Sequence, residues 1–235
     1  MRLDFHSHIL PKMDDGAADA EESLKLLKLL KDDGVDVVVA TPHLYLHKQD
    51  MDGFIRKRGE SANELDRAVK GGDYPQIVVG AEVYFSPALS GLPLKELCVA
   101  GTGHMMLELP CESFSAAFLN TLANFLSACE VNIILAHIER YFDYNKPEVM
   151  DEILSYGVLA QANCDSFEQA RYRKTLFKLI KSGKVRLIGT DSHSAERRPP
   201  AFGKSERVIR KKLSDDTFEG LMKTAEDILY GKLLK

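Results

Sequence analysis

The sequence predicts an α/β protein, more specifically a distorted seven-stranded parallel (β/α) barrel of the TIM type. Short β-branched or apolar runs alternate along the chain with amphipathic stretches of roughly 12 to 18 residues, as in parallel strands joined by crossover helices. Seven such units are present, a number that suits a closed or nearly closed barrel better than an open sheet. A doubly wound sheet would show the same alternation, but no glycine fingerprint for a dinucleotide follows the first strand.

Strands and helices are expected in strict alternation. The strand candidates are the apolar runs 3–5, 35–40, 76–80, 105–109, 131–136, 158–162 and 185–189. The first helix has the clearest limits, because Asp19 is a good N-cap with Glu22 three positions later, and Gly34 can end the helix. Further helices are expected over 53–69, 114–129, 147–156, 166–182 and 204–230, the last with a break near Ser214. No repeat or low-complexity segment divides the chain, so residues 1–235 are predicted to form one domain.

The composition restricts the possible classes of protein. The 235 residues include 31 Lys and Arg against 35 Asp and Glu, a net charge of −4, and 45% are hydrophobic. This combination excludes intrinsic disorder and gives no basic footprint, so we expect no nucleic-acid partner. The chain lacks an export signal and a run of about 18 apolar residues, which predicts a soluble protein with no direct membrane insertion. The spacing of its four cysteines indicates reduced thiols in a cytoplasmic protein.

Potential metal ligands stand at or just beyond the ends of six of the seven expected strands. In a parallel barrel these ends share one rim, so residues distant in sequence would meet there. Alone, a His at a strand end is more often structural and a carboxylate is usually a helix N-cap, but the whole set predicts a metal centre. Its members, in chain order, are His6, His8, His43, Glu82, Glu108, His137, Asp191 and His193.

The residue types indicate which ions could bind. His6 and His8 lie two positions apart on an extended segment, so both rings would point to one side and could share a cation. Glu82 and Glu108 adjoin apolar runs, where an unpaired charge would be costly and a cation would remove that cost. Nitrogen and oxygen donors without thiolates suit Mn, Zn, Fe or Mg. Five imidazoles and four carboxylates, Asp15 included, imply two or three ions.

Several short motifs occur together and in a fixed order. They are His6-Ser7-His8-Ile9 with Asp14-Asp15-Gly16, Thr41-Pro42-His43, Gly80-Ala81-Glu82, Leu107-Glu108-Leu109-Pro110, His137-Ile138-Glu139-Arg140-Tyr141 and Asp191-Ser192-His193. With them the chain resembles the polymerase and histidinol phosphatase (PHP) superfamily. Within that superfamily it is similar to the bacterial metal-dependent protein-tyrosine phosphatases encoded with capsule and exopolysaccharide genes. The similarity runs from residue 3 to about Pro200, and the joint pattern is far more specific than any single motif.

The resemblance implies a centre of three divalent ions, with Mn preferred. Asp15 and Glu108 favour the tyrosine-phosphatase branch, because the histidinol-phosphatase branch is expected to have histidines at these two positions. The first ion would bind His6, His8, Glu82 and Asp191; the second would share Glu82 and add Glu108 and His137; the third would bind Asp15, His43 and His193.

The resemblance also implies two phosphate-binding arginines. One is Arg140, and the other is Arg197 or Arg198, of which we choose Arg198 because it directly precedes two prolines. A guanidinium can bind two phosphate oxygens at once, whereas a lysine is only a point charge. His43, His193 or a bound water could serve as the general acid. The expected partner is a tyrosine-phosphorylated protein, in particular the tail of a membrane-associated bacterial tyrosine kinase that controls capsule or exopolysaccharide synthesis.

The expected reaction is metal-dependent hydrolysis of phosphotyrosine in protein, without a phosphoenzyme. A cysteine-based phosphatase needs an arginine six positions after its nucleophile, and none of the four cysteines has one. Two other functions stay open. One is a small-molecule phosphatase of the histidinol-phosphatase kind, which would use the same ions and arginines. The other is a catalytically inactive regulatory binding module. A metal nuclease is a weaker reading, because the net charge is acidic.

Overall fold

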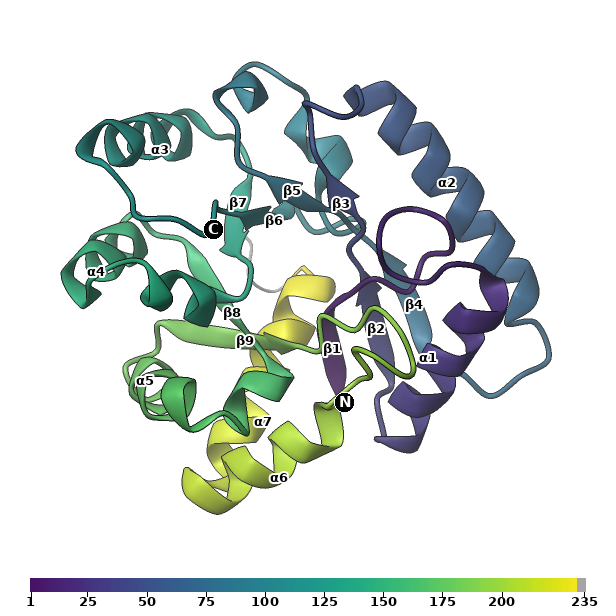
Figure 1. The fold of residues 1–235 in the computed structure, drawn as a ribbon. Coiled ribbons are helices and arrows are strands. Elements are labelled where there is room, and N and C mark those ends of the chain that lie inside the picture. The colour runs from purple at the N-terminus through teal and green to yellow at the C-terminus, as the bar shows by residue number, and fades with distance from the viewer. Residues whose placement is uncertain (232–235) are drawn as a thin grey trace.

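The strands lie at the centre of the molecule and helices surround them (Figure 1). The computed structural model describes residues 1–231, so residues 232–235 of the expected domain lie outside the described part. The strands form a three-stranded sheet in the order β1-β2-β4 and a six-stranded sheet in the order β3-β5-β6-β7-β8-β9. Every described strand pair is parallel, which confirms the expected α/β class. The strands are β1 (Leu3–Ser7), β2 (Val37–Ala40), β3 (His43–Leu44), β4 (Gln76–Val79), β5 (Glu82–Tyr84), β6 (His104–Glu108), β7 (Asn132–Leu135), β8 (Leu159–Asn163) and β9 (Val185–Gly189).

A closed barrel of seven strands is not confirmed, because two strand paths are interrupted. Thr41 and Pro42 separate β2 from β3, and Gly80 and Ala81 separate β4 from β5. Proline cannot donate a ladder hydrogen bond, which accounts for the first break. The same two paths stay neighbours beyond the breaks, since β2 pairs with β4 and β3 pairs with β5. The breaks therefore turn seven expected strands into nine observed ones and divide them between two sheets.

The first and last strands approach each other where the two sheets meet. Ser7 forms a parallel bridge with Ser192, and the backbone N–H of His8 donates to the Ser192 carbonyl at 2.9 Å. Just before this junction Gly189 lies against β1, because a Cβ atom at position 189 would come within 2.4 Å of the His6 Cβ. Glycine is the residue that permits such a close approach of two backbones. The junction brings residues from both ends of the chain to one place.

The helices lie close to the expected positions. Asp19 caps the first helix as predicted, and its side chain accepts a hydrogen bond from the Glu22 N–H at 2.9 Å. Ser214 is the N-cap of the last helix, at the expected break. The helix expected over 166–182 begins only at Ala170, because residues 164–167 form a short 3₁₀ helix instead. The α-helices are α1 (Ala20–Asp32), α2 (Met51–Ala68), α3 (Ala116–Ala128), α4 (Pro147–Ser155), α5 (Ala170–Lys181), α6 (Phe202–Lys212) and α7 (Asp215–Leu229), and the 3₁₀ helices are η1 (Pro87–Leu89), η2 (Leu94–Leu97), η3 (Ile138–Asp143) and η4 (Cys164–Phe167).

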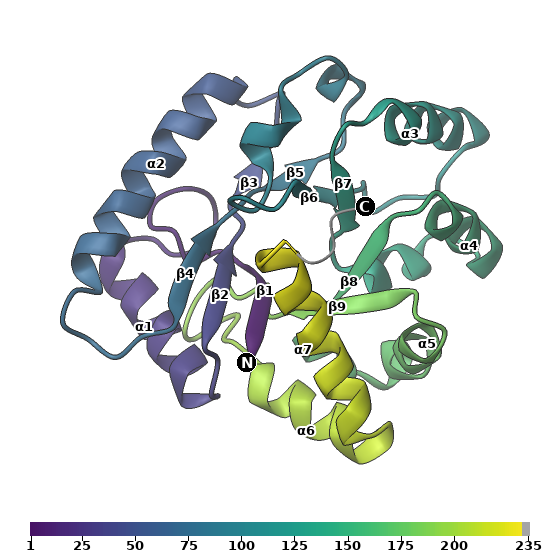
Figure 2. The same ribbon diagram turned by 180° about the vertical axis from the view of Figure 1, so that it is seen from behind.

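The C-terminal helices cover one side of the strands. Figure 2 shows α7 lying across the back of the molecule beside β1 and β9, which it contacts. Phe202 of α6 and Phe218 of α7 are fully buried, and their ring centroids are 6.2 Å apart. No helix within residues 1–231 has the length and apolar character needed to cross a bilayer. The apolar core therefore forms between strands and helices, and the polar strand ends face the opposite rim.

Candidate metal centre

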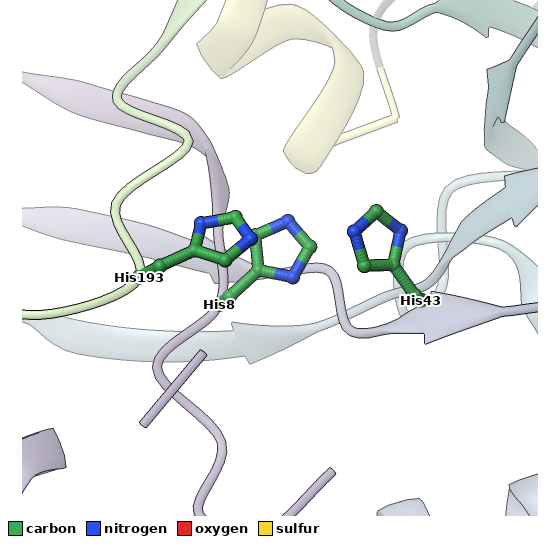
Figure 3. Close-up of side chains that lie close together, drawn as sticks. All are labelled: His8, His43 and His193. Atoms are coloured by element: carbon green, nitrogen blue, oxygen red, sulfur yellow. The ribbon is translucent and has the colours of Figure 1, made fainter. Parts of the chain in front are cut away.

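Most expected ligands lie near the C-terminal ends of β1, β6, β7 and β9, and two others, His43 and Glu82, begin β3 and β5 just beyond the ends of β2 and β4. Within residues 1–231, three groups of side chains offer ligand atoms that all lie within 4.8 Å of one another. Figure 3 shows part of one group, in which the rings of His8, His43 and His193 approach from three separate segments. The groups share members and so form a single cluster. They are His6, His8, Glu82 and Asp191; His43, Glu82 and Glu108; and His8, His43 and His193.

The hydrogen bonds around His6 of β1 and His8, which directly follows β1, leave the other ring nitrogens of the two residues facing each other. The Nδ1–H of His6 donates to the Gln161 Oε1 at 3.1 Å, and the Nδ1–H of His8 donates to the Asp14 Oδ2 at 2.8 Å. Against the effect of burial, nearby carboxylates raise the pKa of both rings, which favours the protonated form when no cation is bound. In the neutral form that binds a metal, each Nε2 would offer a lone pair, and the two Nε2 atoms lie only 3.2 Å apart. The Asp191 Oδ1 lies 3.3 Å from the His8 Nε2. Facing lone pairs with second hydrogen bonds behind them are the arrangement that a shared cation requires.

Glu82 occupies the middle of the cluster and is fully buried. Its Oε2 lies 3.2 Å from the Nε2 atoms of both His6 and His8 and 3.0 Å from the His43 Nδ1. Its Oε1 lies 2.8 Å from the His137 Nε2. Burial alone would raise the pKa of Glu82, but His6 and His43 hold it well below its ordinary value. The carboxylate is therefore charged and contacts four histidines, as a ligand shared between ions would.

The pKa of Glu108 is shifted in the opposite direction from that of Glu82. Burial and the nearby charge of Glu82 raise the pKa of Glu108 to about 8. Its Oε2 is one of five buried side-chain polar atoms that have no hydrogen-bond partner among the described residues. Three of the other four belong to expected ligands as well, namely the Nδ1 atoms of His43 and His137 and the Nε2 of His193. Buried polar atoms are normally paired, so this concentration of unpaired donors and acceptors fits a site for cations.

The two neighbouring aspartates before α1 differ in position. Asp15, an expected ligand, is exposed, and its Oδ1 lies 3.6 Å from the His193 Nε2 and 3.8 Å from the His43 Nε2. Asp14, which sequence reasoning did not select, is partly buried, and its side chain accepts hydrogen bonds from the ring of His8 and the backbone N–H of His43, both at 2.8 Å. These contacts keep the pKa of Asp14 well below its ordinary value. Asp14 thus orients two expected ligands, and Asp15 lies at the mouth.

Two arginines lie beside the cluster and share one carboxylate. The guanidinium groups of Arg140 and Arg198 both donate to the Oδ2 of Asp191, the latter at 2.8 Å. The Oδ1 of Asp191 faces His6 and His8, at 3.6 and 3.3 Å from their Nε2 atoms. The side chain of Arg197 is exposed, and only its backbone N–H has a described hydrogen bond, to the Ser194 Oγ at 2.9 Å. Arg198, unlike Arg197, therefore bonds directly to a candidate ligand, although both line the hollow beside the cluster.

Strand β8 supplies two residues that sequence reasoning missed. The Oε1 of Gln161 accepts from the backbone N–H of His137 at 2.7 Å, and its Nε2 donates to the Asn163 Oδ1 at 3.0 Å. Asn163 in turn donates to the Asp191 Oδ2 at 2.8 Å. His137 and Asp191 are two of the three non-glycine residues with positive φ within residues 1–231. Two amides at alternate positions of an apolar strand were the available signal, because both side chains point to the same side.

The comparison with known proteins decides the family. Residues 2–230 match the family described as "Capsular polysaccharide synthesis, CpsB/CapC". The chain belongs to this family. Among its curated relatives, the tyrosine-protein phosphatase CpsB of Streptococcus agalactiae serotype III (strain NEM316) is 26% identical over 220 residues, which cover 88% of this chain and 89% of the relative. The putative tyrosine-protein phosphatase CapC of Staphylococcus aureus is 29% identical over 210 residues, which cover 84% and 79%.

Solved structures share the fold of this CpsB/CapC-family chain. A structure from a study of YwqE from Bacillus subtilis and CpsB from Streptococcus pneumoniae, described as unique metal-dependent tyrosine phosphatases, superposes with a TM-score of 0.83 at 20% identity. The match covers 97% of this chain and 94% of the other. A histidinol phosphate phosphatase from Lactococcus lactis, solved with Zn, L-histidinol and phosphate, gives a TM-score of 0.61 at 18% identity over 89% and 93%.

The thiols of this CpsB/CapC-family protein lack the features of a catalytic cysteine. All four are free, and none belongs to the three groups of candidate ligands. Burial raises the pKa of Cys98 to about 11 and that of Cys164 well above its ordinary value. A nucleophilic cysteine needs a lowered pKa and an electropositive setting. These four thiols are therefore poor nucleophiles, in line with the missing arginine motif.

Proposed function

We propose that this protein is a metal-dependent protein-tyrosine phosphatase, a phosphoric monoester hydrolase. The observation that carries the proposal is the interlocked cluster of nitrogen and oxygen donors, with unpaired buried atoms and two arginines joined to it through Asp191. Membership of the CpsB/CapC family and relatives named tyrosine-protein phosphatases support the same reaction. We also propose that residues 1–235 act as one domain whose two sheets together serve as a barrel with two interrupted strands.

The proposed centre holds three divalent ions, with Mn the first choice. We keep the ligand assignment implied by the sequence, because each assigned set is close together in the structure. His6, His8, Glu82 and Asp191 form one described group. The Nε2 of His137 lies 2.8 Å from the Glu82 Oε1 and 3.6 Å from the Glu108 Oε1, and the Asp15 Oδ1 lies within 3.8 Å of the rings of His43 and His193. Bound ions would supply a lowered water pKa and Lewis-acid stabilisation of the phosphoryl oxygens. The chain's own contribution is to fix the donors: Asp14 and Gln161 hold the rings of His8 and His6 with Nε2 turned inwards.

The arginines are proposed to bind and orient the phosphate. Arg140 and Arg198 converge on one carboxylate oxygen, so their remaining N–H groups can receive a phosphoryl group from two directions. Electrostatic stabilisation of the equatorial oxygens is the main catalytic contribution in phosphoryl transfer. The leaving phenolate derives from an acid of pKa about 10 and needs less protonation than an alkoxide. His43 and His193 are the two candidates for holding that proton.

The proposed partner is a tyrosine-phosphorylated protein, and the tail of a membrane-associated bacterial tyrosine kinase is our specific candidate. The printed family description, which concerns capsular polysaccharide synthesis, supports a substrate in that process. We place the reaction in the cytoplasm. A phosphotyrosyl peptide from such a tail is therefore the substrate with which the proposal should first be tested.

A small-molecule phosphatase is the second candidate. The observation that favours it is the fold shared with a histidinol phosphate phosphatase over 89% of this chain. Both candidates would use the same ions and arginines, so only substrate preference separates them. A higher kcat/KM for histidinol phosphate than for a phosphotyrosyl peptide would replace our proposal with this one.

One experiment tests the proposed reaction. Purified protein is assayed on a phosphotyrosyl peptide as prepared, after chelation, and after return of Mn, with metal content measured in parallel. We expect chelation and His137→Ala to abolish turnover, Mn to restore the wild type, and thiol alkylation to leave it unchanged. Loss of activity on alkylating a single cysteine would contradict the mechanism. A metal-loaded protein with no phosphatase activity would support the alternative of a regulatory binding module.

A further inference from the structure

The surface formed by α5 and α6 is strongly basic although the whole chain is acidic. These two helices carry ten of the 31 lysines and arginines and only one acidic residue, Glu206. Both helices pack on η4 and lie next to each other in Figure 1. The net charge of the chain is −4, so the rest of the molecule is markedly negative. Such a separation of charge produces a local field that favours an anionic partner.

A groove runs along this basic surface. It has a volume of about 380 Å³ and is lined chiefly by Arg173 of α5 and by Lys204, Arg207, Lys211 and Lys212 of α6. We call it the basic groove. Positions 204, 207 and 211 are three and four residues apart, so these side chains form one stripe along the helix. The four α6 side chains are exposed and Arg173 is half-buried, which leaves the charges open to a ligand.

Most charges of the basic groove are not neutralised within the protein. Among residues 1–231, the one ion pair made by its cations joins the Lys204 Nζ to the Glu168 Oε2, at 3.7 Å. The neighbouring Arg210, in contrast, is turned towards the acids of α6 and α7 and pairs with Glu206, Asp215 and Glu219. Like charges on adjacent helix turns repel one another. An anionic segment in the basic groove would relieve this repulsion.

The basic groove is continuous with the candidate active centre. A hollow of about 280 Å³ beside the cluster is lined by residues that include Arg140, Asp191 and Arg198. Glu168 and Lys204 line both this hollow and the basic groove. A polypeptide whose phosphotyrosine entered the centre could therefore place its adjoining residues in the basic groove. This continuity favours a flanking peptide segment over a separate ligand.

We propose that the basic groove binds an acidic segment next to the phosphotyrosine of the substrate, an inference that rests on the proposed function. Lys204 and Lys211 are seven residues apart on α6, a rise of about 10 Å. An extended peptide covers that length with about three residues. The substrate class is therefore a phosphotyrosyl protein with a short cluster of Asp or Glu on one side of the modified residue. The acidic cluster supplies affinity, and the centre performs the chemistry.

The test compares substrates that differ only in the flanking charge. Three peptides carry the same phosphotyrosine with three acidic residues before it, three after it, or neutral residues on both sides, and free phosphotyrosine is the fourth substrate. In the wild-type holoenzyme we expect one acidic peptide to have a KM about tenfold below that of the neutral peptide, with similar kcat. The advantage should fall as salt is added. Only one of the two acidic peptides should show the lower KM, because the basic groove extends from the candidate centre in one direction.

Two matched double variants test whether the KM advantage depends on the basic groove. Arg207→Gln with Lys211→Gln removes two charges of the basic groove, and Lys178→Gln with Lys181→Gln removes two exposed charges of α5 that line a different hollow. We expect the first double variant to lose most of the KM advantage and the second to keep it. Both should hydrolyse free phosphotyrosine as the wild type does, because none of the four residues belongs to the candidate metal centre.

The outcomes separate the inference from the function on which it rests. No hydrolysis of any phosphotyrosyl substrate by metal-loaded protein would mean that the proposed function is wrong. Hydrolysis with equal KM for all three peptides, or an equal loss of the KM advantage in both double variants, would reject the proposed role of the basic groove and leave the proposed function standing. Flotation with vesicles containing anionic phospholipid tests the alternative that this surface binds a membrane. Binding that the groove variant loses, together with equal KM values, would assign this surface to a membrane and reject the acidic peptide.

Discussion

At the level of single residues, Gln161 shows how the chain prepares the candidate ligands. Its Oε1 accepts two hydrogen bonds, from the ring of His6 and from the backbone N–H of His137. The first bond fixes which ring nitrogen carries the proton, and the second supports a left-handed backbone at His137, where φ is 33°. Such partners behind the ligands tune metal affinity without touching the metal.

The first prediction concerns this residue. Gln161→Leu keeps the approximate shape but leaves the N–H of His137 unpaired, and we expect metal affinity to fall by about 10- to 100-fold. Gln161→Glu keeps the acceptor oxygen and should lose less. Affinity is measured by competition with a chromogenic chelator, with circular dichroism as a check on folding. Gln76→Leu, at an exposed position on β4, is the control, and equal affinities for Gln161→Leu and the wild type would refute the role.

The second prediction distinguishes two adjacent arginines. Arg198→Ala should weaken competitive inhibition by inorganic phosphate by about tenfold or more, because it removes a charge-assisted hydrogen bond to the bound anion. Arg197→Ala should change the inhibition constant less than about twofold, because the Arg197 side chain has no described hydrogen bond or ion pair with the cluster. The inhibition constant is determined with a small aryl phosphate as substrate. Equal effects of the two variants would refute the assignment.

Sequence reasoning located the candidate ligands but not the residues that hold them. Histidines and carboxylates at strand ends are chemically distinctive, and the common rim of a parallel fold brings them together whatever their separation in sequence. Asp14 and Gln161 are different, because their importance depends on which hydrogen bonds they make after folding. A buried amide or an aspartate in a turn has many structural explanations in a sequence. Only the observed partners, at 2.7 to 3.1 Å, single these residues out.

At the level of elements, the interrupted strands explain where the predicted fold differed from the structure. The runs 35–40 and 76–80 were recognised from their β-branched residues. Their continuations, β3 and β5, are only two and three residues long and begin with the polar side chains His43 and Glu82. Such short pieces carry no hydrophobic periodicity. The interruption has a structural effect, because it turns the chain so that these two candidate ligands begin a strand at the rim.

The third prediction tests the close approach of β9 to β1. In Gly189→Ala the added Cβ would lie 2.4 Å from the Cβ of His6 and 2.7 Å from its backbone N, so β9 must move. We expect a loss of stability of about 3 kcal/mol or more and weaker metal binding. Urea denaturation and chelator competition measure the two effects. Gly220→Ala in α7 is the control, where nothing lies within 4 Å of the new Cβ and a helix interior should gain about 0.5–1 kcal/mol.

At the level of the whole molecule, an ion-pair network joins the N-terminal segment to α6. Arg2 binds Glu206 with two parallel hydrogen bonds of 2.9 and 3.0 Å, and Arg210 donates to the same carboxylate at 2.8 Å. Burial would raise the pKa of Glu206, but the two arginines lower it below its ordinary value. The residues are 204 positions apart in sequence, so the network fastens the first strand to the last part of the fold.

The fourth prediction follows from this lowered pKa. A carboxyl group with a lower pKa in the folded state stabilises the protein above its unfolded pKa of about 4.3, and this stabilisation is lost as the pH falls through the folded value. Glu206→Gln should therefore reduce the free energy of unfolding by about 1 kcal/mol at pH 7 and progressively less below pH 4. Urea denaturation across this range measures the difference. Glu196→Gln, at an exposed position, is the control, and a deficit that stayed constant with pH would contradict the linkage.

The α/β class of the molecule could be predicted from the sequence, but whether the strands close into a barrel could not. Alternating runs predicted parallel strands with surrounding helices, the N-cap at Asp19 placed one helix start correctly, and the break expected near Ser214 coincides with the start of the last helix. Whether seven strand paths close evenly depends on contacts between residues far apart, such as the Ser7–Ser192 bridge. No local pattern encodes such a contact. The meeting of the two sheets, and with it the final form of the rim, depends on these long-range contacts.

The distribution of the cluster along the chain has a consequence for biosynthesis. Its members come from both ends of the sequence, because His8 is bonded through its backbone to Ser192 and contacts Asp191 and His193. A nascent chain leaving the ribosome cannot assemble these contacts until residue 193 has emerged. Until then the early histidines have no complete set of neighbours with which to capture an ion. Metal loading should therefore follow translation, and a product terminated before residue 190 should purify without its ions.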